Sequence, residues 1–490
     1  MTSSKSTKRA LIYSTLALLM CVAMLIGTTF AWFTDTASTG VNKIVSGNLK
    51  VDIIGANSDS HIERLNFTKA ATTDAEAGAK ILWEPGCRYL TEGFRIANKG
   101  NLALKWKAQV NKGTTTANEG NFDLLDVIDF YLVTKAADGT ETETALDEFT
   151  GNLKKTETSD VYYIKGVMQT TAGNDYQGLT LDGIGITVVA TQDTVENDSF
   201  NNQYDKDAEY PILVTTGDKL QATVNNATAP VNIVLANSIK TNNFVIPADK
   251  DVTLDLNGRT VTNAGSHTIL NKGHLTLTDS SADKSGQIIS LKGNTAALRN
   301  GDNAVCVVEG GTISRDGANG NTWHVIENFG KMTFNGGKVV LKNGNGFAIT
   351  NGWNYFDPGA STTHAVMEIN ALELDTDSSG IKNCRYGDLT VNDVTVTSTG
   401  YWALSNDYLG TAVINGGTLT SNSFKAVSNG AAMTVNGGTF DGTEGLFVQS
   451  YATSTVLNGG TYTNMNVNAL ASYVGTGHTA RQSGTSVIIK

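Results

Sequence analysis

The sequence predicts an all-β protein in which a jelly-roll-like β-sandwich precedes a right-handed parallel β-helix of about ten coils. Gly is abundant and Pro is scarce, with 51 and 5 among 490 residues, which favours stacked strands and tight turns. A pattern around a Gly-Gly turn recurs through the C-terminal half, and apolar residues keep fixed positions relative to it. This repeat predicts the β-helix over residues 211–490. Many short alternating strands separated by turn residues predict the sandwich over residues 32–210.

The repeat has a base period of about 22 residues, interrupted by loop insertions. The five Gly-Gly segments begin at Glu309, Asn335, Asn415, Asn436 and Asn458. Relaxing the glycines adds Asn257, Thr278, Asn370 and Asn392, and the steps from Asn257 to Asn458 are then 21, 31, 26, 35, 22, 23, 21 and 22 residues. Such spacing is typical of a solenoid in which each coil adds one strand to every face.

Apolar residues stand three before, one before and four after each repeat position. The set three before is Leu254, Leu275, Cys306, Met332, Met367, Leu389, Ala412 and Met433. The set one before is Leu256, Leu277, Val308, Phe334, Ile369, Val391, Ile414 and Val435. Because strand side chains alternate with period two, both sets share one face of a strand, and we expect them to stack inside the solenoid.

Asparagines form a second ladder, each following a short apolar strand. Its members are Asn271, Asn300, Asn328, Asn351, Asn383, Asn406 and Asn429. Asn tolerates a left-handed backbone at a sharp corner, and its amide can bond the Asn above and below. A sugar-binding row is the functional alternative, but the regular spacing favours corner geometry. We also expect caps at both ends: a last strand over Val487–Ile489 at one end, and the N-terminal sandwich or a short helix over Thr216–Val224 at the other.

The N-terminus has the order of a secretory signal. Residues 1–9 carry three positive charges and no acid, Ala10 to Ile26 is almost wholly apolar, and small residues follow. We expect a signal peptide over residues 1–31, cleaved between Ala31 and Trp32. A retained membrane anchor is the alternative, because the apolar run continues to Phe33 and nearly spans a bilayer.

Three segments resemble the TasA/camelysin family of exported proteins. They are Ala31-Trp-Phe-Thr-Asp35 with Ile44 to Asp52, Glu84-Pro-Gly86 with Phe94 to Leu104, and Gly185 to Gln192. The resemblance covers about residues 10–200 and implies a jelly-roll-like sandwich and processing by a SipW-type signal peptidase. It also implies self-assembly, in which the mature N-terminal strand completes a neighbouring subunit's sheet. Here that strand would include Trp32, Phe33, Leu49, Val51 and Ile53.

The sequence holds no strong catalytic or metal-binding motif, and we expect no cofactor and no metal. There is no His-Glu-x-x-His, no Gly-x-Ser-x-Gly and no P-loop. The β-helix resembles the pectate-lyase superfamily in architecture, many of whose members cleave or bind polysaccharides. Five charged residues in adjacent coils were therefore considered as a Ca²⁺-bridged lyase cluster: Asp375, Asp377, Arg385, Asp388 and Asp393.

The best candidate for ligand binding is the longest insertion, which follows Asn351. It carries Trp353, Tyr355 and Phe356, and further aromatic residues lie in nearby coils: Trp323, Tyr401, Trp402 and Tyr408. Aromatic residues in a loop above a repetitive scaffold suit sugar stacking or protein contact. The alternative is that Trp353 and Phe356 fold back and cover the solenoid.

These observations favour a secreted, non-enzymatic protein of the cell surface or biofilm matrix. Its sandwich would mediate assembly, and its β-helix would adhere to an extracellular glycan or to a host or bacterial surface. A polysaccharide lyase or hydrolase acting on acidic glycans is the alternative, and a purely structural spacer is the second. The formal net charge of −11 disfavours nucleic acid as a partner.

Overall fold

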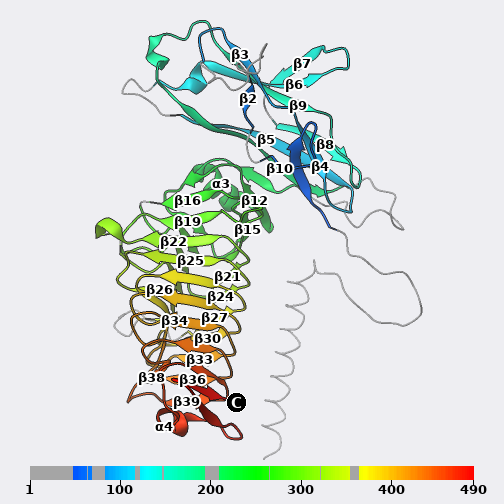
Figure 1. Cartoon of the computed structure of the whole chain (residues 1–490). Helices are drawn as coiled ribbons and strands as arrows, with labels where there is room; N and C mark the ends of the chain where they lie inside the picture. The colour runs from blue at the N-terminus through cyan, green and yellow to red at the C-terminus, as the bar shows by residue number, and fades with distance from the viewer. Residues whose placement is uncertain are drawn as a thin grey trace, which may run out of the picture.

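The computed structural model describes residues 48–62, 65–68, 83–115, 122–145, 148–193, 209–263, 265–320, 322–353 and 363–490. Within these ranges the regular secondary structure is almost entirely β-strand, and Figure 1 shows a strand-rich N-terminal unit followed by a stacked solenoid. None of the helices in these ranges combines the length and the apolar composition needed to cross a bilayer. The all-β architecture and the repetitive solenoid predicted from the sequence are therefore confirmed.

The N-terminal unit consists of two antiparallel sheets, as far as the described residues go. One sheet contains β1 (Val51–Gly55), β2 (Phe67–Thr68), β3 (Arg88–Thr91), β4 (Phe94–Asn98), β6 (Ile128–Lys135), β7 (Glu141–Ala145) and β9 (Tyr162–Met168). The other contains β5 (Leu104–Thr115), β8 (Glu148–Leu153) and β10 (Leu181–Gln192), with short 3-10 turns η1 (Leu124–Asp126) and η2 (Asn174–Tyr176) outside the sheets. Apolar side chains of both sheets share one core, in which Trp106 of β5 meets Tyr162 of β9 at 6.2 Å between ring centroids. The jelly-roll connectivity stays a prediction.

Three parallel sheets form the solenoid, and each complete coil contributes one strand to each of them in turn. The first solenoid sheet contains β11 (Ile212–Val214), β12 (Val231–Leu235), β15 (Asp251–Asp255), β18 (His274–Thr278), β21 (Val305–Val308), β24 (Lys331–Phe334), β27 (Ala365–Ile369), β30 (Gly387–Val391), β33 (Thr411–Ile414), β36 (Ala432–Val435) and β39 (Ser454–Leu457). The second contains β13 (Ile239–Lys240), β16 (Thr260–Asn263), β19 (Gln287–Ser290), β22 (Thr312–Asp316), β25 (Lys338–Lys342), β28 (Glu373–Thr376), β31 (Thr395–Ser398), β34 (Thr418–Ser421), β37 (Thr439–Asp441) and β40 (Gly460–Tyr462). The third contains β14 (Phe244–Ile246), β17 (Ile269–Asn271), β20 (Leu298–Asn300), β23 (Ile326–Asn328), β26 (Phe347–Asn351), β29 (Ser379–Asn383), β32 (Leu404–Asn406), β35 (Val427–Asn429) and β38 (Leu446–Val448). This gives about ten coils, as the period predicted; the right-handed sense of the coiling stays a prediction.

The predicted inner columns are present. Leu275, Cys306, Met332, Met367, Leu389, Ala412 and Met433 pair in register through the first solenoid sheet, and all are almost fully buried. Burial raises the pKa of the Cys306 thiol to about 12, so it behaves as a core residue. The predicted register is wrong only at the first repeat position, because Leu254 pairs with Leu277 and Val252 takes the place beside Leu275.

The buried Asn ladder is also present, but its backbone differs from our expectation. The side-chain Nδ2 of each Asn from Asn271 to Asn406 donates to Oδ1 of the next ladder Asn at 2.7–2.9 Å. None of the seven has a positive φ. At the corners of this ladder the left-handed backbone comes after the Asn, at Asn303, Tyr386 and Leu409 with φ 61°, 59° and 60° and at Gly352 with φ 93°. Asparagine is needed at these corners for its side-chain hydrogen bonds.

Both ends of the solenoid core are covered. At the N-terminal end, helix α3 (Gly217–Asn226) buries Leu220 and Val224 against the first coils, which confirms the predicted capping helix. At the C-terminal end, α4 (Val467–Leu470), η4 (Ala471–Tyr473) and the hairpin of β41 (Ala480–Ser483) with β42 (Ser486–Ile489) follow the last coil, and β42 pairs antiparallel with β40 (Figure 1). The N-terminal unit also touches the first coils, where Val189 of β10 packs in one cluster with Leu213 and Val234.

Candidate functional site

The third solenoid sheet presents a polar column on its outer face. In each strand three consecutive residues pair with the next coil. Because side chains alternate along a strand, the first and third of these point inward and the second points outward. The outward residues, in register from coil to coil, are Leu270, Arg299, Glu327, Thr350, Lys382, Ser405, Ser428 and Phe447. We call this set the outer column.

Three cations of the outer column and its flanks are each paired with an acid on the same side. Arg299 contacts Glu327 at 3.0 Å, and Lys382 contacts Asp407 at 3.1 Å. A third pair, Lys425 with Glu444 at 3.0 Å, lies beside the last coils. Each cation also lies over an aromatic ring: Phe329 for Arg299, Phe347 for Lys382 and Phe447 for Lys425, at 4.5, 5.6 and 3.5 Å from the centroid. This face therefore carries local charge pairs that cancel.

Glu327 is the most buried ionisable residue of the outer column, with 4% of its surface exposed. Its Oε2 accepts from the Arg299 guanidinium, and its Oε1 accepts from the Trp323 indole Nε1 at 3.0 Å. The second bond fixes the orientation of the Trp323 ring. Burial lowers the pKa of the neighbouring His324, and its ring Nδ1 lies 2.9 Å from the Phe347 carbonyl oxygen. His324 is therefore neutral at neutral pH, and Glu327 is balanced by Arg299.

Exposed aromatic rings gather along the same sheet. The described part of the chain has four large exposed aromatic side chains: Trp323, Tyr401, Tyr408 and Tyr451, which are 37%, 58%, 46% and 55% exposed. Trp323 and Tyr401 lie in loops that lead into β23 and β32, and Tyr408 and Tyr451 lie in loops that leave β32 and β38. All four thus flank the third solenoid sheet. We call these four rings, together with the outer column, the aromatic strip.

Two of the predicted binding residues belong to this region. Tyr408 is one of the exposed rings. Trp402 is half-buried and supports the strip from below, with its ring 4.7 Å from Phe424 and 6.0 Å from Phe447 between centroids. Trp323 and Tyr401 are not among the predicted binding residues. Tyr451 was missed; it follows Val448, which pairs with the last ladder residue, Asn429.

Trp353 covers the solenoid, and the structure supports the alternative that it folds back onto it. It is 7% exposed, its ring lies 4.5 Å from that of Phe329, and its backbone N–H donates to the Arg385 carbonyl at 2.9 Å. Tyr355 and Phe356 lie outside the described residues. Trp353 therefore buttresses the Phe329–Arg299 contact and is not itself an exposed ring.

The charged residues considered as a lyase cluster are not brought together. Asp375 lies on the outer face of the second solenoid sheet, paired with Lys338 at 2.7 Å, and Asp388 lies on the first, paired with His364 at 2.8 Å. The others occupy corners: Asp377, Arg385 and Asp393. Within the described ranges, no three His, Cys, Asp or Glu side chains are grouped so that they could hold a metal ion. The proposed Ca²⁺ arrangement is therefore not formed by these residues.

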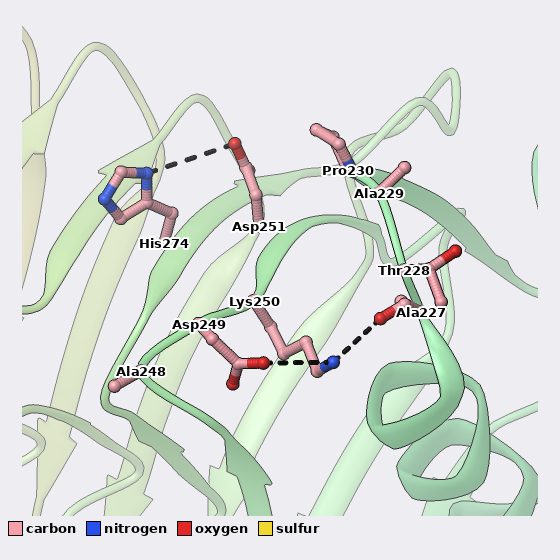
Figure 2. A pocket seen from close by; sticks show the side chains of 9 residues that line it. All are labelled: Ala227, Thr228, Ala229, Pro230, Ala248, Asp249, Lys250, Asp251 and His274. Atoms are coloured by element: carbon pink, nitrogen blue, oxygen red, sulfur yellow. Dashed lines mark hydrogen bonds and ion pairs between the residues drawn. The ribbon is translucent and has the colours of Figure 1, made fainter.

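A pocket of about 580 Å³ lies near the N-terminal end of the solenoid, where the loops after α3 and β14 lead into the first solenoid sheet (Figure 2). It is lined by Ala227, Thr228, Ala229, Pro230, Ala248, Asp249, Lys250, Asp251 and His274. Its lysine is already engaged, since Lys250 Nζ donates to the Ala227 carbonyl at 2.7 Å and contacts Asp249 at 3.2 Å. No aromatic ring lines this pocket, and its only histidine lies 3.9 Å from Asp251. It lacks the stacking surface that the aromatic strip offers.

The predicted assembly strand is described only in part. Val51 and Ile53 belong to β1, which pairs antiparallel with β4 at the edge of its sheet, with Ile53 opposite Ile96. Leu49 precedes β1 and is 39% exposed. Ala31, Trp32 and Phe33, and with them the predicted cleavage site, lie outside the described residues. β1 completes its own sheet here, and assembly between chains stays a prediction.

Comparison with known proteins gives no family. No family model matches the sequence, and no curated protein matches it. Among solved structures, the chain was compared with the catalytic domain of a GH87 alpha-1,3-glucanase in complex with tetrasaccharides. The two are 11% identical, and the comparison covers 84% of this chain and 96% of that one, with a TM-score of 0.14. A TM-score this low establishes no common fold with that domain.

Proposed function

We propose that this protein is an exported surface or matrix protein that binds neutral glycans through the aromatic strip, without cleaving them. One observation carries the proposal: the large exposed aromatic side chains of the described chain all flank a single solenoid sheet. Aromatic faces beside hydrogen-bonding groups suit sugar rings, which have an apolar face and a polar edge. Clustering of such rings on one face is the arrangement expected of a binding surface.

A neutral ligand is favoured by the charges. The chain has a formal net charge of −11, which repels polyanions at long range. Locally, three cations that could have attracted an acidic sugar, Arg299, Lys382 and Lys425, are paired with Glu327, Asp407 and Glu444. The hydroxyl of Ser405 and the paired ionic groups are left to meet sugar hydroxyls. An acidic glycan, the substrate of the lyase alternative, would have to displace these pairs.

A glycan array with the purified chain tests the proposal. Tyr408→Ala and Trp323→Ala are each expected to lower the affinity for the bound neutral glycan about tenfold, because each removes a stacking surface that supports no core. Val366→Ala, which changes an exposed apolar residue of the first solenoid sheet, serves as the matched control. Unchanged binding by both ring variants would refute a role for the aromatic strip, and the absence of any glycan bound by the wild-type chain would favour the spacer.

The hydrolase alternative rests on Glu327, a nearly buried carboxylate beside an exposed indole. On our proposal, glycan that binds the wild-type chain is recovered at its original length. Release of reducing sugars that is lost in Glu327→Gln would instead identify a hydrolase.

We further propose that the N-terminal segment assembles the protein by strand addition. The supporting observation is the position of β1 at a sheet edge, directly after the residues that would pair with a neighbour. Deletion of residues 32–43 is expected to leave a folded monomer that no longer polymerises, measured by light scattering and electron microscopy. Filaments formed equally well by the truncated chain would contradict strand addition.

A further inference from the structure

We infer that the ligand of the aromatic strip is an extended neutral polysaccharide that lies parallel to the solenoid axis and contacts two separate stations. The inference rests on the proposed function and adds the length and direction of the ligand. It follows from where the exposed rings fall along the stack of coils, and from what lies between them.

The first station is centred on Trp323, in the loop that leads into β23. The indole donates to Glu327, and Arg299 lies on the other oxygen of that carboxylate. A sugar ring stacked on the indole face would have its edge beside both an acceptor, Glu327, and a donor, Arg299. Because the indole is held by a hydrogen bond at 3.0 Å, little side-chain freedom is lost when the sugar binds.

The second station is formed by Tyr401, Tyr408 and Tyr451. Tyr401 and Tyr408 lie on opposite sides of β32, one before the strand and one after it. The ring of Tyr451 reaches back over the preceding coil, because a Cβ added to Gly430 would lie 2.7 Å from it. Gly430 follows β35, the neighbour of β32 in the sheet. These three rings therefore surround two adjacent coils.

The two stations are too far apart for a short sugar. In the third solenoid sheet β23 and β32 are separated by β26 and β29, so three strand spacings lie between them. At ~4.8 Å per spacing the distance along the axis is ~14 Å, which is longer than a disaccharide. Between the stations the outer column presents Lys382, while Thr350 is buried. Only a chain that runs along the axis reaches both sets of rings.

Occupying both stations with one chain raises affinity, because the second contact forms at high effective concentration once the first is made. The inference is tested by titrating the full chain with neutral glucan oligosaccharides of two and of six units, in α- and β-linked series, by isothermal calorimetry. The six-unit ligand is expected to bind at least about tenfold more tightly than the two-unit ligand of the same linkage. Trp323→Ala and Tyr408→Ala should each bring the six-unit affinity down to about the two-unit level.

The two-unit ligand gives the internal control. Each single variant keeps one intact station, so two-unit binding is expected to persist with reduced stoichiometry, and Val366→Ala should behave as wild type. Equal affinity for the two lengths, with ring variants still weakened, would overturn the extended-chain inference while leaving glycan binding intact. Failure of either length to bind in any linkage, together with an array that shows no glycan ligand, would overturn the proposed function itself.

Discussion

Replacement of Asn406 by Asp is expected to lower the free energy of unfolding by about 3–5 kcal/mol at neutral pH, because it places an uncompensated charge inside the solenoid. Asn406 is 1% exposed. Its Nδ2 donates to Asn429 Oδ1 at 2.9 Å and to the Ala432 carbonyl at 2.8 Å. A carboxylate can donate to neither, so it would face two acceptors that repel it. Urea unfolding followed by circular dichroism measures the loss.

A second row of asparagines supplies the matched control: at the solvent surface, each donates from Nδ2 to Oδ1 of the one before it, in the order Asn335, Asn370, Asn392, Asn415, Asn436 and Asn458. In a neighbouring coil, Asn415 donates to Asn392 Oδ1 at 2.7 Å and accepts from Asn436 at 2.8 Å, but at the solvent surface. Asn415→Asp is expected to cost less than about 1 kcal/mol, since water solvates the charge. The loss in Asn406→Asp should also shrink as the pH falls toward 4, because the folded state then favours the protonated, neutral carboxyl. Equal losses of unfolding free energy in Asn406→Asp and Asn415→Asp would contradict the assignment of the buried Asn ladder to the core.

Met367→Ala is expected to lower the free energy of unfolding by about 2–5 kcal/mol, because it opens a cavity in the middle of an inner column. Met367 is fully buried and lies in register between Met332 and Leu389. The coils above and below are tied by parallel strand pairing, so they have little room to collapse into the space. The same urea titration measures the change.

Its control is the next residue along the same strand. Val366 points outward from β27 and is 39% exposed, so Val366→Ala should change the free energy of unfolding by no more than about 0.5 kcal/mol. Because side chains of a strand alternate between faces, adjacent residues test the same register from opposite sides. If Val366→Ala lowered the free energy of unfolding strongly and Met367→Ala did so only slightly, Val366 would point inward and Met367 outward, contrary to the structure.

The solenoid was predictable because the same short sequence pattern recurs in coil after coil. Each inner position recurs in about ten coils, so an error at one coil does not affect the others. Leu254 is an example. The predicted pairing was wrong by two residues in the first coil, but the predicted pairing from Leu275 onward is confirmed. The backbone of the Asn ladder was not predictable from residue preference alone, because Asn suits both a left-handed corner and a side-chain hydrogen bond. The structure shows that only the hydrogen bond is used.

The aromatic strip was predictable only in part, because the type of a residue does not determine whether its side chain is exposed. Trp353 and Tyr408 both stand in loops that follow the Asn ladder, but Trp353 packs on Phe329 and is 7% exposed, whereas Tyr408 is 46% exposed. Their different exposure depends on which side chains the neighbouring coil places beside them, and the local sequence does not show this. The convergence of Trp323, Tyr401, Tyr408 and Tyr451 on one sheet likewise required the order of the three strands in each coil.

The direct test of the account is the affinity of the chain for the strongest neutral glycan on the array when all four exposed rings are removed together. The variant combines Trp323→Ala, Tyr401→Ala, Tyr408→Ala and Tyr451→Ala, and its unfolding midpoint in urea is measured alongside. Our account predicts that glycan binding disappears while the unfolding midpoint stays close to that of the wild type, because these rings lie outside the core. Wild-type affinity in this variant would contradict the assignment of the third solenoid sheet as the binding face.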